Sequence, residues 1–559
     1  MDLLVNGVKL CYNETMKNDV KTVDFSAMSR EEIEAYAMRL SLEKEKLAYE
    51  LAWYQEQFRL SRANRFGASS EQMPLEQISL FNEAETESYG KILPEPDLTQ
   101  VKPRKKQKGH KEKLTKDLPK ETIEYLLTEE QMSCPVCESP LHEMKKEIRK
   151  ELKVIPAQVM VTEHVQYVYA CRNCQDTGID KTPIIYAPMP KPALENSLAS
   201  PSMLAYVMSR KYADAMPLYR QEQQFQKSGL NLSRQTLANW MVKASEKHLS
   251  LLYDLMHKEL VKKDVLHADE TVLEVLREPR REAGTNSYMW LYRTSGGSVP
   301  IVLYEYTQGR SGDYAKAFLK GFRGYLQTDG YAGYHKLSES PNGEPPGVIQ
   351  VGCFAHARRK YVDAKKAIST KETLTSANID KGLSYCNRLF LIESKCKEMS
   401  PKERYDYRKK EATPVVDEYF AWVKSMEDKV LPKSKLGDAI IYSVRQEKYL
   451  RNYLLDGRLE ISNNRAERSI KPFVIGRKNW LFSNTEKGAT ASAVIYSIIE
   501  TAKENNLIPF QYLEYLFHQL PNVDRNDSAA LAQLLPWSGT LPESCRSQAN
   551  TKDSTTCAN

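Results

Sequence analysis

A change of apolar period near residue 261 constrains the fold of this 559-residue chain more than any other feature. Upstream, apolar residues recur mostly at helical spacing. Downstream, short runs of β-branched and aromatic residues with period two predict strands. The predicted strands lie at about 264–276, 287–294, 299–306, 324–329 and 347–353, with a helix at about 311–322. These elements predict an α/β domain built on one sheet.

Three strands, a helix, a strand, a helix and a strand, in this order, are typical of a ribonuclease-H-like fold. In that fold the first and fourth strands are neighbours. Residues of about 355–455 are strongly helical and charged, and they are long enough to form an inserted helical subdomain. We therefore expect a catalytic domain over 256–510 with a helical insertion at about 360–455.

Three carboxylates stand out by their local context. Asp269 and Asp329 end apolar strand-like stretches, and Glu467 lies one turn into a predicted helix. Asp269 and Glu270 point to opposite faces of their strand, because side chains alternate, so only one of them faces a shared site. With 73 acidic residues in the chain, such a triple also arises by chance.

Convergence of Asp269, Asp329 and Glu467 would favour metal binding over bare acid–base chemistry. Three unpaired carboxylates repel and raise one another's pKa, and a bound divalent cation relieves this repulsion. Oxygen ligands suit Mg²⁺, or Mn²⁺ in its place. The sequence thus predicts a split two-metal site for cutting or joining nucleic acid.

Basic residues surround these acids and suit contacts with phosphates. His356 follows the last strand. The alternatives for its side chain are a contact with the DNA backbone, orientation of an acid, or packing within the protein. The predicted DNA contacts here are Arg465, Arg468, Lys471, Arg477, Lys478, Arg358 and Arg359.

Ten cysteines are present, and four of them form two CxxC pairs separated by a segment of strand character at 151–169. Two such pairs around a β-hairpin predict a zinc ribbon, in which four thiolates hold one Zn²⁺. The other six, Cys353 among them, are read as structural or incidental thiols. The predicted zinc ligands are Cys134, Cys137, Cys171 and Cys174.

Residues of about 198–250 are predicted to be helical, with a turn at Gly229 and a second helix capped by Ser233. Helix, glycine-containing turn and capped helix are the order of a helix-turn-helix, in which Arg234, Gln235 and Asn239 would face the DNA groove. Most helical hairpins bind no DNA, so this alternative stays open.

An N-terminal helix over about 29–62 carries apolar residues every seven positions and begins with a capping box between Ser29 and Glu32. The heptads predict a short coiled coil and hence a homo-oligomer, whereas the alternative is an amphipathic helix packed on its own core.

A basic linker follows at 102–120. It holds nine Lys/Arg, including Lys105 and Lys106, against Glu112 and Asp117, which accounts for the whole net charge of +7. This charge suits an arm along phosphates or, equally, a solvated linker.

No run of 18 uncharged apolar residues occurs in the sequence, so we expect no membrane span. The first 24 residues do not read as a signal peptide, which predicts a reducing cytoplasmic setting, where DNA binding would make the protein nucleoid-associated.

Seven short stretches along nearly the full length resemble the transposases of bacterial insertion sequence 66. They are RFGASSE at 65–71, KYADAMPLYR at 211–220, HADET at 267–271, TDGYAGY at 328–334, GCFAHARR at 352–359, NNRAERSIKP at 463–472 and LLPW at 534–537. The two CxxC pairs also match. Phe354 departs from the tryptophan common there, and the linker is unusually rich in lysine.

The resemblance implies a DDE-type recombinase with Asp269, Asp329 and Glu467 as its metal-binding acids. Such an enzyme cuts the 3′ ends of its element and joins the freed 3′-hydroxyls to target DNA. Its partners would be the element's terminal inverted repeats, target DNA and accessory proteins of the same element. A non-catalytic DNA-binding derivative and a cleavage-only nuclease remain alternatives.

The expected organisation is multidomain. It comprises a coiled-coil region (1–72), a polar then basic linker (73–120), the zinc ribbon (121–190), the helix-turn-helix-like domain (191–255), the catalytic domain (256–510) and a C-terminal segment with a disordered tail (511–559).

Overall fold

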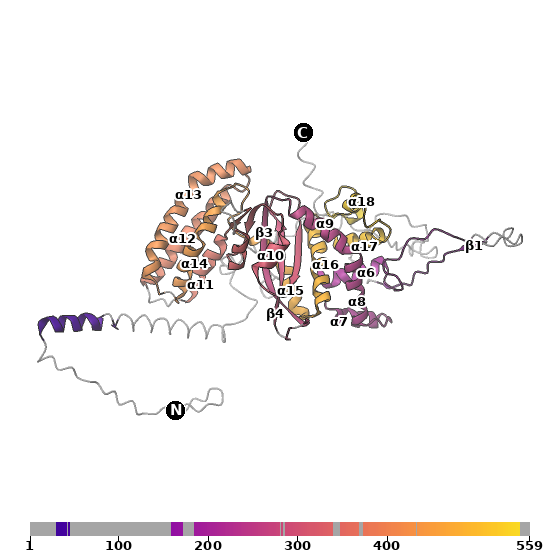
Figure 1. Cartoon of the computed structure of the whole chain (residues 1–559), viewed down its shortest axis with the longest axis horizontal. Helices are drawn as coiled ribbons and strands as arrows, with labels where there is room; N and C mark the ends of the chain where they lie inside the picture. Colours follow the sequence, from indigo (N-terminus) through magenta and orange to yellow (C-terminus); the bar gives the residue numbers. More distant parts are fainter. Residues whose placement is uncertain are drawn as a thin grey trace, which may run out of the picture. The chain divides into compact units, whose positions relative to one another are not determined.

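The computed structural model of the protein describes residues 29–41, 43–44, 158–170, 184–279, 281–282, 285–338, 347–367, 373–431 and 433–547. The described helices and strands are labelled in Figure 1 where there is room. They belong to two compact units: the larger holds the described residues within 1–81, 193–216 and 239–559, and the smaller those within 82–192 and 217–238. The four predicted zinc ligands, the basic linker and the C-terminal tail lie outside the described residues.

A mixed sheet forms the centre of the larger unit. Its strands run in the order β5-β4-β3-β6-β7, with β4 antiparallel to both neighbours and β3, β6 and β7 parallel. The predicted pairing of the first and fourth strands is confirmed, because Leu266 of β3 lies opposite Leu326 of β6. The strands are β3 (Val265–Arg277), β4 (Asn286–Thr294), β5 (Val302–Thr307), β6 (Gly324–Gln327) and β7 (Val348–Val351).

Both faces of this sheet are covered, which explains why β4 reads as an apolar run. Four consecutive residues of β4, Met289 to Tyr292, are fully buried. Helix α16 (Glu486–Glu504) covers β5 and satisfies its backbone: Ser497 Oγ accepts from Tyr304 N, and Thr501 Oγ1 accepts from Val302 N. A short strand, β8 (Ser483–Thr485), pairs with the far end of β3.

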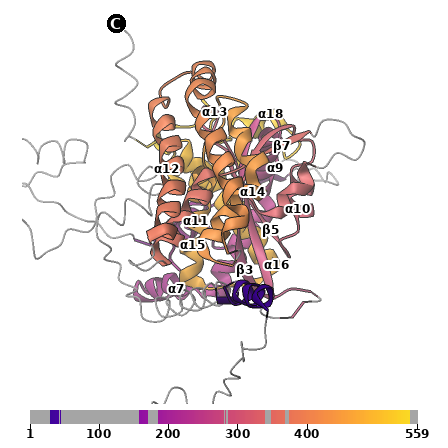
Figure 2. The same cartoon turned by 90° about the vertical axis from the view of Figure 1, so that its left-hand side faces the viewer.

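The predicted helical insertion is present between β7 and the Glu467 helix. Its members are α11 (Phe354–Ala367), α12 (Thr373–Lys395), α13 (Pro401–Met426) and α14 (Lys435–Arg451), which lie together beside the sheet (Figure 2). They share an apolar core. Arg408 is buried within it, where Nη2 donates to Glu393 and to the Leu459 carbonyl, so its charge is paired.

Helices α6 (Pro201–Tyr212), α9 (Ser250–Leu260) and α17 (Pro509–Gln519) belong to the larger unit, with α10 (Gly312–Phe318) and α18 (Ser528–Ala532). Tyr212 packs edge-on against Tyr496 at 4.9 Å between ring centroids. The predicted helical hairpin is confirmed as α7 (Leu218–Lys227) and α8 (Arg234–Ala244). Gly229, at φ +81°, makes the turn, and Ser233 Oγ accepts from Thr236 N as a cap.

Residues 30–41 and 43–44 are helical, and the predicted capping box is confirmed by Ser29 N donating to Glu32 and Glu32 N donating to Ser29 Oγ. Ile33 and Leu40 of the predicted heptads are 38% and 47% exposed. In the smaller unit, β1 (Val168–Ala170) pairs antiparallel with β2 (Ile184–Tyr186). Across the described part of the chain, no helix combines the length and apolar character needed to cross a membrane.

Candidate functional site

The register between β3 and β6 brings the two aspartates side by side. His267 lies opposite Gln327 in this parallel pair. Asp269 lies two residues after His267, and Asp329 lies two residues after Gln327. The two segments therefore carry an acid to the same level of the sheet. Asp269 is the fifth residue of β3 and lies inside the strand, so it does not end the strand as the sequence suggested.

Electrostatics place all three predicted acids in one cluster. Burial raises the pKa of Asp269 well above its ordinary value, and the charges of Glu270, Asp329 and Glu467 raise it further. Glu467 comes from the first turn of α15 (Asn464–Trp480), which packs across β3. Charges this far apart in the sequence act on one carboxyl only because the fold brings them together.

Asn463, just before α15, fixes the position of Glu467. Its Nδ2 donates to the Ala268 carbonyl at 2.8 Å, and its Oδ1 lies 3.1 Å from His267 Nδ1, so the side chain is bound to β3 on both sides. Its backbone N–H points at Cys353 Sγ, 3.1 Å away. One buried asparagine thus ties the helix that carries Glu467 to the strand that carries Asp269.

The loop after β6 holds Asp329 through contacts with the helical insertion. Tyr331 N donates to Asp329 Oδ1 at 2.9 Å, and the hydroxyl of Tyr442, in α14, donates to the Asp329 carbonyl at 2.9 Å. Gly330 has φ +96°, and a Cβ there would approach Gln446 and Tyr442 to 3.1 Å. Glycine is therefore required between the acid and the rest of the loop.

Glu270 is a second buried acid in β3 whose contacts sequence reasoning missed. Its carboxylate accepts from Arg310 at 2.6 Å and from the Tyr334 hydroxyl at 2.6 Å. Burial is the main cause that raises the pKa of Glu270, and the charge of Asp329 raises it further. The hydrogen bonds from Tyr334 and Arg310 lower this pKa in part. This network ties β3 to the loop that begins at Asp329, which gives Glu270 a structural role beside the metal-ligand role predicted for Asp269.

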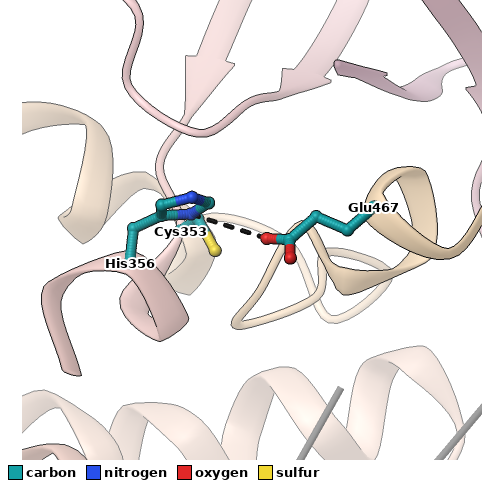
Figure 3. A group of neighbouring side chains, drawn as sticks. All are labelled: Cys353, His356 and Glu467. Atoms are coloured by element: carbon teal, nitrogen blue, oxygen red, sulfur yellow. Dashed lines mark ion pairs between the residues drawn. The ribbon is translucent and has the colours of Figure 1, made fainter. Parts of the chain in front are cut away.

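Glu467 faces two residues from the first two turns of α11. His356 Nδ1 lies 3.7 Å from Glu467 Oε1 (Figure 3). Arg359 Nη2 donates to Glu467 Oε2 at 3.1 Å. Cys353 Sγ completes a group whose ligand atoms all lie within 4.8 Å of one another. Of the alternatives for His356, orientation of an acid agrees best with this contact. Cys353, which was read as an incidental thiol, is part of the same cluster.

Several of the predicted phosphate contacts carry protein partners. Arg477 Nη1 donates to Thr271 Oγ1 on β3, and Arg465 Nε donates to Glu460 at 2.7 Å. Arg358 is only 8% exposed and donates to Asn387 at 2.7 Å, so it is a packing residue and we leave it out of the proposed interface.

The remaining predicted DNA contacts differ in exposure. Lys478 is exposed, and Arg468 and Lys471 are half-buried. On α8, Arg234, Gln235 and Asn239 are all exposed, as a groove-facing helix requires. Lys105 and Lys106 lie outside the described residues.

The donor set at the three acids fits a divalent cation of the Mg²⁺ or Mn²⁺ kind. The predicted ligand atoms are carboxylate oxygens, and Glu467 Oε1 is buried without a hydrogen-bond partner. A bound cation would satisfy that oxygen and offset the repulsion that raises the pKa of Asp269.

The sequence over the sheet and the three acids matches a known protein family. Residues 196–491, which include the sheet and all three acids, match the family described as Transposase IS66 family. The chain belongs to the IS66 transposase family. Three further matches of this family agree with the order along the chain: the zinc-finger binding domain of transposase IS66 at 131–175, the IS66 C-terminal element at 497–537, and Transposase C of IS166 homeodomain at 53–123.

Two similar proteins are both described as uncharacterized. The uncharacterized protein y4qI of Sinorhizobium fredii (strain NBRC 101917 / NGR234) is 31% identical over 399 residues, which cover 69% of this chain and 70% of that protein. The uncharacterized protein y4jD of the same strain is 28% identical over 430 residues, covering 76% and 81%. No solved structure gives a significant match.

Proposed function

We propose that this IS66-family protein is a DNA transposase with a ribonuclease-H-like core, in which Asp269, Asp329 and Glu467 bind Mg²⁺ or Mn²⁺ and catalyse strand cleavage and transfer. The observation that carries the proposal is the β3–β6 register, which brings Asp269 and Asp329 to the same level of the sheet, together with the packing of α15, which carries Glu467, across β3. The sheet order β5-β4-β3-β6-β7 supports the assignment of the core.

Divalent cations at these carboxylates would supply the Lewis-acid chemistry, activating a water for cleavage and the 3′-hydroxyl for transfer. The protein's own residues hold the geometry. Asn463 keeps Glu467 turned toward β3, and Tyr442 and Gly330 hold the Asp329 loop. Positioning of this kind accounts for much of the rate in phosphoryl transfer, because it needs little covalent chemistry from the protein.

The proposed DNA interface combines several basic elements. Near the acids, the charge on α15 suits phosphates of the cleaved strand. On α8, the exposed side chains suit base or backbone contacts at the terminal repeats. The proposed contacts are Arg465, Arg468, Lys471, Arg477, Lys478, Arg359, Arg234 and Gln235, with Lys105 and Lys106 of the linker.

Two further parts of the proposal rest on sequence. Cys134, Cys137, Cys171 and Cys174 are proposed to hold Zn²⁺, in keeping with the zinc-finger match over the same residues. The N-terminal heptads are proposed to form the coiled coil of a homo-oligomer. Element-encoded accessory proteins are proposed as partners, and the nucleoid as the place of action.

The test is single-turnover cleavage and joining of DNA that carries the terminal repeats of the protein's own element, with Mg²⁺. Asp329→Ala is expected to abolish both reactions, whereas the control Asp313→Ala, at an exposed acid on α10, is expected to retain them. Cleavage that survives Asp329→Ala would reject the assignment of the site. Cleavage without joining would reassign the protein as a nuclease.

A further inference from the structure

The cluster of Cys353, His356 and Glu467 has ligand chemistry that the three-acid site does not use. It offers one sulfur, one imidazole nitrogen and one carboxylate oxygen, all within 4.8 Å of one another. Figure 3 shows His356, from the first turn of α11, and Glu467, from α15, directed toward each other, with the Cys353 sulfur alongside. The three residues come from the end of β7 and the starts of two helices, so the fold itself assembles them.

The spacing is close to that of a tetrahedral transition-metal site. Metal bonds of about 2.0–2.3 Å place ligand atoms about 3.3–3.8 Å apart. His356 Nδ1 and Glu467 Oε1 are already 3.7 Å apart. Only small side-chain movements would be needed to bring all three atoms onto one ion.

Two of the ligand atoms make no hydrogen bond. His356 Nδ1 and Glu467 Oε1 are both buried, and they face each other at 3.7 Å, beyond hydrogen-bond distance. A buried polar atom without a hydrogen bond destabilises the folded state. An ion bound between these atoms would satisfy both at once.

A cation bound here would have to displace the proton of the Cys353 thiol. Burial, with the charge of Glu467, raises the pKa of this thiol to about 12. The backbone N–H of Asn463, which points at Sγ from 3.1 Å, and the N–H groups of Ala355 and His356, at the start of α11, offset that rise in part. Such donors and a helix N-terminus stabilise a thiolate once a cation displaces its proton to solvent.

We propose that Cys353, His356 and Glu467 form a second metal site, specific for Zn²⁺ rather than Mg²⁺, with water as the fourth ligand. Sulfur and nitrogen ligands select Zn²⁺, and Mg²⁺ prefers oxygen. The site goes beyond the three-acid centre because Cys353 and His356 take no part there. It shares Glu467 with that centre, so an ion in one site withdraws a ligand from the other.

Arg359 opposes the binding of an ion at this second site. Its Nη1 lies 3.2 Å from His356 Nε2 and its Nη2 holds Glu467. Ligation through Nδ1 requires the ring proton on Nε2, so Arg359 must leave that nitrogen when an ion binds. Removal of this arginine should therefore raise the affinity for Zn²⁺. A folding defect would lower that affinity, so the two causes can be told apart.

The test is the number and affinity of Zn²⁺ ions on the full-length protein, titrated against a chromogenic chelator without DNA. Cys353→Ser and His356→Ala are each expected to bind one ion fewer per chain than wild type, or to weaken that ion at least about 100-fold. The control Cys545→Ser, at another buried cysteine, is expected to match wild type. Unchanged Zn²⁺ binding in both cluster variants would overturn the proposal.

Arg359→Met and cobalt substitution keep the test decisive if a cluster variant folds poorly. Arg359→Met is expected to bind the additional ion more tightly than wild type, and an unchanged or weaker affinity would contradict the proposal. Substitution with Co²⁺ is expected to give thiolate charge-transfer absorption that falls by the contribution of one thiolate in Cys353→Ser. Equal absorption in the two proteins would contradict ligation by Cys353.

One consequence rests on the proposed function. Since Glu467 is shared, Zn²⁺ should inhibit Mg²⁺-dependent DNA cleavage, and Cys353→Ser should lessen that inhibition. Equal inhibition of the two proteins would separate the Zn²⁺ site from the reaction without affecting the binding result. Absence of cleavage in all proteins, with Zn²⁺ binding as expected, would reject only the proposed function.

Discussion

Replacement of Asn463 by alanine tests whether one buried side chain holds Glu467 against the sheet. The substitution removes the bonds of Asn463 to the Ala268 carbonyl and to His267 Nδ1, both of which are buried. Each buried group left without its partner costs about 1–3 kcal/mol. Two such groups sum to about 2–6 kcal/mol, and partial relaxation around the substitution leaves an expected loss of about 2–4 kcal/mol of unfolding free energy for Asn463→Ala.

The size of the thermal shift follows from the size of the folded unit. The described part of the larger unit holds roughly 320 residues, and unfolding entropy near 2.1 cal/mol/K per residue gives about 0.7 kcal/mol/K. A loss of about 2–4 kcal/mol then lowers Tm by about 3–6 °C. Single-turnover cleavage should fall by about 100-fold, because Glu467 would lose its fixed position.

Differential scanning fluorimetry and the cleavage assay measure the two effects together. The matched control is Asn479→Ala, in the same helix, whose Nδ2 donates to the Ala215 carbonyl at an exposed position. Its Tm should stay within about 1 °C of wild type. An Asn463→Ala protein with wild-type Tm and wild-type cleavage would refute the reasoning that this residue positions the site.

Three further outcomes are expected. Burial raises the pKa of Glu305 to about 8, so the folded state holds its proton more tightly than the unfolded state, and stability falls as pH rises from about 4.5 to 8. Glu305→Gln should remove about 4 kcal/mol of that fall in urea unfolding, and an unchanged pH profile would count against it. Lys478→Gln should reduce the slope of log affinity against log salt by about 0.9 in DNA-binding titrations, whereas the exposed Lys397→Gln in the insertion should leave it unchanged. Tyr442→Phe should cost about 1 kcal/mol of stability, through loss of the bond to the Asp329 carbonyl, and equal stability of the two proteins would argue against that bond.

The strand order and the positions of the acids could be read from the sequence because they depend on local patterns. Apolar alternation marked β3 to β7 to within a few residues. Asp269 and Asp329 each follow a buried strand segment, and the parallel pairing of β3 with β6 then makes them neighbours. Local pattern and topology agree here, as they do in a consistently folded domain.

Contacts made by single long-range side chains could not be read in the same way. Nothing local marks Asn463 as the partner of Ala268 and His267, nearly 200 residues away. Strand alternation allowed only one of Asp269 and Glu270 to face the site, and the family resemblance selected Asp269, yet Arg310 and Tyr334 give Glu270 a defined place beside the site.

Cys353 and His356 carried a signal that was available. A cysteine and a histidine three residues apart, at the start of a helix, have the spacing of metal ligands. The two CxxC pairs are a stronger metal-binding pattern than this mixed pair. The third residue of the cluster, Glu467, is more than 100 residues downstream. Arg358 was predicted to contact DNA because it is basic and adjacent to Arg359. In α11 the two side chains point in different directions, and that of Arg358 is buried and bonded to Asn387.

The central claim, that Asp269, Asp329 and Glu467 bind divalent cations, is tested most directly by the thermal midpoint with and without Mn²⁺. Without the ion, Asp269→Asn should melt at the same temperature as wild type or higher, because burial and the neighbouring acids disfavour the carboxylate that it replaces. Mn²⁺ at about 100 times its Kd should stabilise wild type by about 2.7 kcal/mol, or about 4 °C, and leave Asp269→Asn unchanged. Equal shifts in the two proteins would contradict the claim.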